Sequence, residues 1–386
     1  MSDIEGFRLQ LRAWLEANCP VEMRQPLGDD SDMVWGGRNP TFKNDAQRQW
    51  LEACAREGYT APDWPKEYGG AGLSATDAKV WREELARIGA RQPLWSFGLS
   101  MLGPALLKFG TEEQKRHYLP PIARGEIRWC QGYSEPGSGS DLVSLQTFGE
   151  DKGDHWLVNG QKVWTSYADK ADWIFCLVRT DKANKYGGIS FLLFDMASEG
   201  VTARPIKLIS GASPFCETFF DNVKVPKDQI VGQVNRGWEI AKYLLGHERE
   251  MISTLGGGDR PAAFGPVLAR SGPLDPLLRA EVARFDVDSL AFSALNEKST
   301  DEAKVGRAHP AQPSVMKYAG TELNKRRHEL IMAAGGSRAL EWESEASRGG
   351  VAARSWLRTK ANSIEGGTSE IMLGVIAKRI LNLPGD

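Results

Sequence analysis

The segment 129–141 brings together groups of the kind that bind a charged or ring-shaped ligand. It reads WCQGYSEPGSGSD and contains Gly132, Gly137 and Gly139, with carboxylates at Glu135 and Asp141. Glycine has no Cβ, so backbone N–H groups in such a turn approach a ligand closely. Amides presented by a loop bind anions such as phosphates, and they also bind acceptor atoms on a ring. The segment therefore indicates either a ligand-binding loop or a plain glycine-rich turn between a helical and a β region.

A second candidate for chemistry is Glu248, in the run LLGHER. Leu244 and Ile252 lie four residues to either side of it and would share its face of a helix. Burial of that face would raise the pKa of the carboxyl group toward neutral, which suits a general base. Either Glu248 is functional, or it is a structural carboxylate paired with a neighbour such as Arg249 or Lys242.

Composition limits the classes of protein to which the chain can belong. Its 386 residues exceed one compact core, so two or three domains are expected. The formal charge of −2 and the lack of a long basic run argue against a nucleic-acid surface, and no apolar run is long enough to span a membrane. The five cysteines are odd in number and form no CxxC pair, which argues against a disulfide framework and a zinc site. The same cysteine pattern predicts no bound metal. The N-terminus reads as an amphipathic helix and not as a signal peptide, so we expect a cytoplasmic protein.

The elements that position these groups fall into three predicted domains. The first is 1–128, where a helix is expected to begin directly after each of four N-cap residues, Ser2, Asn44, Ser74 and Thr111. The second is 129–232, where β-type runs dominate and Asn159-Gly160 is the strongest short hairpin signal. Further strands are expected at 173–179, 189–194, 201–206 and 217–225.

The third predicted domain, 233–386, returns to helices. One is expected at 237–255, and Asp275 followed by Pro276 opens another, as an N-cap with proline at the first helical position. A third is expected at 313–334 from its apolar spacing, and the last from Thr368 to Leu383.

Five ordered motifs make the chain resemble the acyl-CoA dehydrogenase family. They are the turn-dense loop 61–72, the run 110–126, the Glu-Pro-Gly-Ser-Gly-Ser-Asp loop, Asn-Gly-Gln-Lys with Trp-Thr-Ser at 159–166, and Gly-Gly-Thr-Ser-Glu at 366–370. The resemblance implies an α+β fold with an N-terminal helical domain, a central antiparallel β-barrel and a C-terminal four-helix bundle. It also implies an FAD-dependent oxidoreductase that converts an acyl-CoA thioester to its trans-2-enoyl form.

The resemblance assigns flavin contacts to particular residues. Trp164 matches an aromatic ring packed against the flavin, and an apolar ring suits that role. Ser166 matches a hydroxyl near the flavin N5 edge, and Ser140 one that bonds the pyrophosphate. The remaining cofactor positions are Gln131, Tyr133 and Ser134 along the isoalloxazine ring, and Thr368 and Glu370 near the adenosine half.

The resemblance leaves two glutamates as candidates for the base that removes the α-proton. Many family members carry the base directly before Gly-Thr, but this chain has Gly366 there, and Glu365 is one residue too early. Other branches place the base in a Leu-x-x-Glu-Arg pattern, which Glu248 matches. Arg249 then matches a position near CoA, although it can also be a plain helix ion pair. The backbone N–H at or near Gly366 matches one that polarises the thioester carbonyl.

The chain departs from the family where homotetramers complete the FAD site across an interface. Neither Arg260 nor Arg270 is followed by Phe-Gly at the usual spacing, and Met332 stands where a Gln is usual. A second, related subunit that supplies those groups would explain this departure. We therefore expect a tetramer, either a homotetramer or an α2β2 tetramer with that subunit. Two-subunit dehydrogenases of this kind occur in the family, on dicarboxylic, cholesterol-derived and bile-acid side-chain thioesters. The chain looks most like the larger subunit of pimeloyl-CoA-type dehydrogenases.

The electron acceptor implied by the resemblance is an electron-transfer flavoprotein. An acyl-CoA oxidase would use the same site with oxygen as acceptor. A noncatalytic or DNA-binding relative on the same fold is a further alternative, but a net charge of −2 does not favour a basic groove. A flavin monooxygenase relative would normally lack a buried base such as Glu248.

Overall fold

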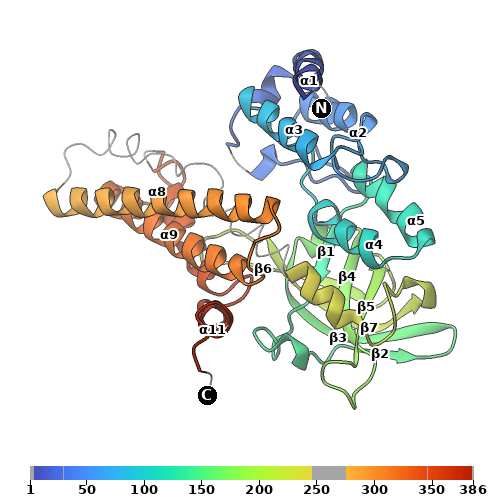
Figure 1. Ribbon diagram of the computed structural model, residues 1–386. Helices are drawn as coiled ribbons and strands as arrows, with labels where there is room; N and C mark the ends of the chain where they lie inside the picture. The colour runs from blue at the N-terminus through green and yellow to red at the C-terminus, as the bar shows by residue number, and fades with distance from the viewer. Residues whose placement is uncertain (1–3, 29, 246–274, 346, 385–386) are drawn as a thin grey trace. The chain divides into compact units, whose positions relative to one another are not determined.

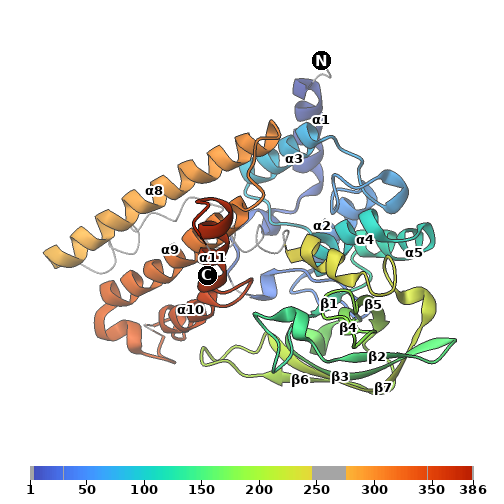
Figure 2. The same cartoon turned by 60° about the horizontal axis from the view of Figure 1, so that its bottom comes forward.

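The computed structural model describes residues 4–28, 30–245, 275–345 and 347–384. The chain divides into two compact units, one formed by 1–206 with 214–244 and the other by 207–213 with 245–386. Figures 1 and 2 show two views of both units. The division into three domains at 128 and 232 stays a prediction.

The first unit begins with helices whose starts follow the predicted caps. The side chains of Asn44, Ser74 and Thr111 each accept a hydrogen bond from the backbone N–H three residues later, and Gln114 completes a capping box with Thr111. These three caps are confirmed, whereas Ser2 lies outside the described residues. The helices are α1 Ile4–Asn18, α2 Asp45–Arg56, α3 Ala75–Arg87, α4 Gly103–Phe109 and α5 Glu112–Ala123, with a π-helical turn at Gly98–Leu102.

The same unit contains a curled seven-stranded sheet. Its strands pair in the order β1-β4-β2-β3-β7-β6, and β5 pairs with β4. Pairing is antiparallel except between β4 and its neighbours β1 and β2, which run parallel to it. The strands are β1 Trp129–Gly132, β2 Phe148–Asp151, β3 His155–Ser166, β4 Trp173–Arg179, β5 Ile189–Asp195, β6 Val201–Ile206 and β7 Phe215–Pro226.

Helices α4 and α5 lie against this sheet (Figures 1 and 2). The buried Tyr118 of α5 packs edge-on against Trp129 and Trp173, with ring centroids 5.4 and 5.3 Å away. The Gln114 amide donates to the carbonyls of Asp228 and Ile230, which follow β7. These contacts fix β1, where the glycine-rich loop begins, onto the helical layer.

The hairpin predicted at Asn159-Gly160 is wrong, because β3 runs straight through it. Its pairing with β7 shifts register between Val158 and Gly160, which marks a β-bulge. Gly160 has φ +150°, and a Cβ there would stand 2.7 Å from the Cα of Thr147. The glycine therefore permits a close backbone approach inside a long strand.

The second unit is helical in the part described. Asp275 caps α8 through the N–H groups of Leu277 and Leu278, with Pro276 in the first turn, as predicted. Helices α8 and α9 lie side by side (Figures 1 and 2) and pack through Val282, Phe285 and Leu330. The helices are α8 Pro276–Lys304, α9 Gln312–Gly335, α10 Val351–Thr359 and α11 Ser369–Arg379, so the last helix ends four residues before the predicted Leu383.

All five cysteines are free and buried, in agreement with the predicted absence of disulfides. Among the described residues, no group of His, Cys, Asp and Glu side chains is arranged to hold a metal ion. No helix in the described part of the chain has both the length and the apolarity needed to cross a membrane.

Candidate flavin-binding site

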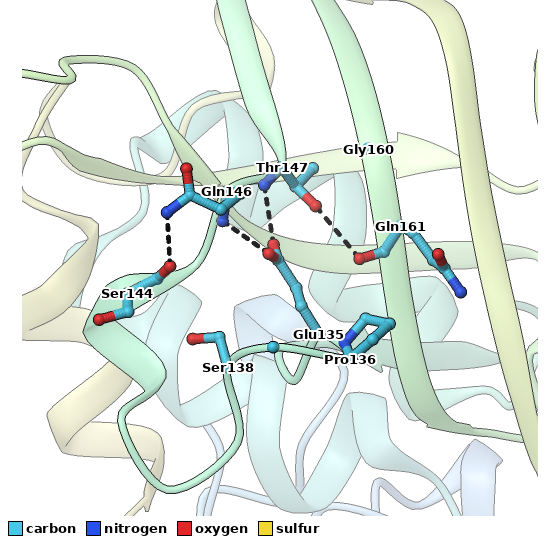
Figure 3. A pocket seen from close by; sticks show the side chains of 9 residues that line it. Glu135, Pro136, Ser138, Ser144, Gln146, Thr147, Gly160 and Gln161 are labelled. Carbon is cyan, nitrogen blue, oxygen red and sulfur yellow. Dashed lines mark hydrogen bonds between the residues drawn. The ribbon is translucent and has the colours of Figure 1, made fainter.

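A buried ion pair anchors the glycine-rich loop to the sheet. Lys162 of β3 is fully buried, and its Nζ lies 2.8 Å from Oε1 of Glu135 and 3.1 Å from the carbonyl oxygen of Tyr133. The Glu135 carboxylate also accepts the N–H groups of Gln146 and Thr147 at 2.6 and 2.9 Å (Figure 3). Burial alone would raise the pKa of Glu135, but Lys162 and these N–H groups reverse the effect, so the pKa lies below its usual value.

A pocket of about 500 Å³ opens beside this anchor. It is lined by 135–138 of the loop, by Ser144, Gln146 and Thr147, and by 160–161 of β3 (Figure 3). Because Gly160 carries no side chain, Thr147 lies directly against β3 and forms one wall of the pocket. The close approach at the bulge thus shapes the space beside the loop.

The tip of the loop is held by its own hydrogen bonds and is open on its outer side. Glu135 and Ser138 exchange backbone hydrogen bonds of 3.0 Å, and the Ser138 hydroxyl donates to the carbonyl of Asp141 at 2.7 Å. A Cβ added at Gly137 or Gly139 would meet no atom within 4 Å. Ser140 is exposed at the same tip. Open backbone beside an exposed hydroxyl fits the predicted contact with a pyrophosphate.

A second β-bulge turns Trp164 out of the sheet. Register between β3 and β7 shifts between Lys162 and Thr165, which are both buried. Between them Trp164 adopts φ +62° and is 55% exposed. A large aromatic residue in the left-handed region is strained, and such strain tends to occur at functional sites. The bulge therefore presents a flat apolar ring beyond the sheet, as a wall for a flavin requires.

Six predicted flavin residues fall within one stretch of the first unit. The N–H of Val163 donates to the carbonyl of Ser134 at 2.9 Å, which joins the loop to the strand segment that carries Trp164 and Ser166. Gln131 and Tyr133 lie on β1 and directly after it. Sequence reasoning missed the roles of Glu135 and Lys162, although a glutamate inside a glycine-rich loop and a lysine within a β-type run were visible signals.

The C-terminal motif lies in the second unit. Thr368 caps α11, its hydroxyl accepting the N–H of Ile371 at 3.2 Å. Gly366 and Gly367 have φ +66° and +102°, which glycine adopts at little cost. The exposed Glu370 sits in the first turn of α11, where backbone N–H groups and the Thr368 hydroxyl lower the pKa of its carboxyl group.

Glu365 is engaged by neighbours in the same loop. Its two carboxylate oxygens lie 3.1 and 2.8 Å from the guanidinium of Arg358, and the Asn362 amide donates to it at 2.5 Å. A bidentate arginine occupies both oxygens of the carboxylate that it binds. The other candidate base, Glu248, and its neighbour Arg249 lie outside the described residues.

Helix α9 holds this loop through a row of polar side chains that the sequence analysis did not identify. Lys317 is fully buried, and its Nζ donates to the carbonyls of Asn362 and Gly367 at 2.9 and 2.7 Å. One turn further on, Glu322 accepts hydrogen bonds from Ser363 and Ser369. The positions of Gly366 and Thr368 are thus set by α9.

Known proteins of similar sequence share this architecture. The models of the N-terminal, middle and C-terminal domains of acyl-CoA dehydrogenases match residues 37–126, 130–223 and 235–381. Acyl-CoA dehydrogenase IpdE1 of Mycobacterium tuberculosis is 36% identical, with 100% of this chain and 99% of that protein covered.

Two solved structures are similar along the whole chain. The Tcur3481-Tcur3483 steroid ACAD has a TM-score of 0.79 and 30% identity, with 100% of this chain and 99% of that chain covered. The ChsE4-ChsE5 complex from Mycobacterium tuberculosis has a TM-score of 0.73 and 28% identity over 100% and 99% of the two chains. With the three domain matches, they confirm the predicted α+β fold class.

Proposed function

The chain belongs to the acyl-CoA dehydrogenase family of FAD-dependent oxidoreductases, and from that premise we propose that it desaturates an acyl-CoA thioester between Cα and Cβ, with Glu248 as the base. The observation that carries the proposal is the strained, exposed Trp164 beside the open glycine-rich loop. The product is the trans-2-enoyl thioester.

The cofactor fits the residues present. Trp164 offers a flat ring, and the open N–H groups near Gly137 and Gly139, with the Ser140 hydroxyl, offer donors to a pyrophosphate. Gln131, Tyr133, Ser134 and Ser166 would hold the ring, and Thr368 and Glu370 the adenosine half. When bound, FAD supplies the acceptor for the hydride that leaves Cβ.

Glu248 is proposed to take the α-proton while the C–H electron pair forms the new double bond. The contacts of Glu365 support this choice, because Arg358 and Asn362 already occupy both oxygens of that carboxylate. The thioester carbonyl would be polarised by the backbone N–H at or near Gly366, as in an oxyanion hole. Arg249 is proposed to contact the CoA moiety.

A related second subunit is proposed as a partner. The chain lacks the Arg-x-x-Phe-Gly pattern and carries Met332 in place of Gln. Two similar solved structures, the Tcur3481-Tcur3483 steroid ACAD and the ChsE4-ChsE5 complex, each carry the names of two proteins. We also propose an electron-transfer flavoprotein as the electron acceptor, and this proposal rests on the family resemblance alone.

Anaerobic titration with CoA thioesters tests the reaction. A substrate should bleach the oxidised-flavin absorbance of the wild-type protein. The Glu248→Gln variant should keep its flavin, but its rate of bleaching should fall by at least about 100-fold. Glu365→Gln is the matched control and should keep most of the rate. Near-normal bleaching by Glu248→Gln would remove the assignment of the base.

A further inference from the structure

Two residues with left-handed backbone flank Ser166, whose hydroxyl is assigned to the N5 edge of the flavin. Trp164 has φ +62°, and Tyr167, directly after Ser166, has φ +52° and ψ +33°. A large side chain in this region is strained unless its surroundings hold it there. The bulge in β3 accounts for Trp164, but Tyr167 lies beyond the end of the strand, so other contacts must hold it.

The ring of Tyr167 belongs to a cluster with Trp35 and Arg128. Its centroid lies 4.9 Å from that of Trp35, and the guanidinium carbon of Arg128 lies 5.2 Å from the tyrosine ring and 4.7 Å from the tryptophan ring. Arg128 is 9% exposed, and desolvation strengthens a cation–π contact. The backbone N–H of Tyr167 also donates to the carbonyl of Pro214 at 2.7 Å. These contacts hold the chain in its left-handed turn where β3 ends.

Both neighbours of the tyrosine ring are anchored. The backbone N–H of Arg128 donates to Oδ2 of Asp172 at 2.8 Å, and its carbonyl accepts the N–H of Asp172, also at 2.8 Å. Trp35 packs against Phe97, with ring centroids 5.7 Å apart. The cluster is therefore fixed both to the chain entering β1 and to the helical layer.

The direction of the Ser166 hydroxyl depends on this backbone. Ser166 is half-buried, and among the described residues its hydroxyl has no hydrogen-bond partner, so no contact of its own fixes the group. We propose that the Arg128–Trp35–Tyr167 cluster positions the Ser166 hydroxyl at the N5 edge of the flavin. Tyr167 and Arg128 are then positioning residues that act through Ser166. This inference rests on the proposed function.

A double-mutant cycle tests it on the flavin-loaded protein, together with the related subunit where loading requires one. The flavin reduction potential is measured by dye-coupled reduction without any thioester. Ser166→Ala should change the equilibrium between oxidised and reduced flavin by about tenfold, or about 30 mV for a two-electron couple, because a hydrogen bond to the ring is lost.

Tyr167→Gly should produce most of this shift although the hydroxyl is still present. Glycine admits the left-handed backbone and many other conformations, so without the ring the position of Ser166 is no longer fixed. The Ser166→Ala/Tyr167→Gly double variant should shift no further than Ser166→Ala, because both changes remove the same contact. Tyr167→Phe keeps the ring and should keep the wild-type potential.

Arg128→Met keeps the inference testable if Tyr167→Gly does not fold. Its effect on the flavin equilibrium should be smaller by at least about threefold when Ser166 is already alanine. The control is Arg204→Met, since Arg204 also lies over an aromatic ring, that of Phe219 at 4.9 Å, but is exposed on β6. It should leave the potential unchanged. FAD content and the unfolding midpoint are recorded for every variant, because a merely structural role would lower these and leave the potential of the bound flavin unchanged.

Additive shifts in the double variant would overturn the inference, because the tyrosine ring would then not act through Ser166. A wild-type potential in Ser166→Ala, or in flavin-loaded Tyr167→Gly, would overturn it too. Failure of the proposed function gives a different result, since the cycle uses no thioester. If the cycle shows coupling but no thioester bleaches the flavin, the positioning stands and the reaction falls. If thioesters bleach the flavin but the cycle shows no coupling, the reaction stands and the role of Tyr167 falls.

Discussion

Lys162 and Glu135, 27 residues apart in the chain, form an ion pair of 2.8 Å with the lysine fully buried beneath the glycine-rich loop. The lysine also binds the carbonyl of Tyr133, and the glutamate binds two N–H groups after the loop. One pair therefore holds both ends of the predicted flavin loop.

Lys162→Met should destabilise the protein by about 3–5 kcal/mol, because it leaves the Glu135 carboxylate buried without its cation. FAD affinity should fall with it, since the loop loses its anchor. Chemical unfolding and flavin content measure the two effects. Lys152→Met is the matched control, because the Lys152–Glu150 pair of 2.7 Å is exposed and its loss should cost less than about 1 kcal/mol. Equal stabilities of the two variants would show that the buried pair does not anchor the loop.

Trp164→Asn should separate stability from flavin binding. The ring is exposed and asparagine tolerates the left-handed region, so the unfolding free energy of the flavin-free protein should change by less than about 1 kcal/mol. FAD affinity should fall about tenfold, the value of one aromatic contact. Fluorescence titration with FAD measures this. Trp129→Ala, in which a residue 1% exposed is truncated, should instead cost about 3–5 kcal/mol. Unchanged FAD affinity in Trp164→Asn would exclude the ring as a flavin wall.

Glu84 of α3 should make stability depend on acid pH. It is 1% exposed and is bound by Arg12, Arg8 and Arg87 at 2.9, 2.9 and 2.5 Å. Hydrogen bonds from Arg12, opposed by burial, lower its pKa from 4.5 to about 2. A depressed pKa adds stability that is fully present above the unfolded value and is lost as pH falls from about 4.5 toward about 2.

Glu84→Gln should therefore be about 2 kcal/mol less stable than the wild-type protein at neutral pH, and the gap should narrow below pH of about 4. Urea unfolding at a series of pH values gives the curve. A gap that stays constant with pH would mean that packing, and not charge, accounts for the loss.

Flavin content should reveal whether the chain needs a second subunit. Purified alone, the chain should carry clearly less than one FAD per protomer, because Met332 and the missing Arg-x-x-Phe-Gly pattern leave no donated half-site. Co-purification with a related subunit should restore full occupancy, measured from the flavin and protein absorbance. A fully loaded homotetramer would count against the heteromeric proposal.

Local chemistry made much of the fold predictable. The caps at Asn44, Ser74, Thr111 and Asp275 were confirmed because each depends on a side chain three or fewer residues from its partner. The hairpin predicted at Asn159-Gly160 was wrong because β-bulges and tight turns favour the same residue types. Only the pairing of β3 with β7 and the close approach of Thr147 show that Gly160 lies in a bulge.

The site was predictable only in part, for the same reason. The glycine-rich loop and Trp164 could be found by motif, but the partners that hold them come from distant parts of the chain. Lys162 and Glu135 meet only through the sheet, and Lys317 reaches Gly367 across 50 residues. The role of Glu248 stays a prediction.

The burial of all five cysteines has a practical consequence for experiments on the intact protein. Burial raises the pKa of every one of these thiols above its usual value, so they stay protonated at neutral pH. The native fold should therefore react very little with a maleimide dye. One cysteine introduced at an exposed position outside the predicted flavin loop, such as Ala183→Cys, would carry a spectroscopic label without prior removal of the natural thiols.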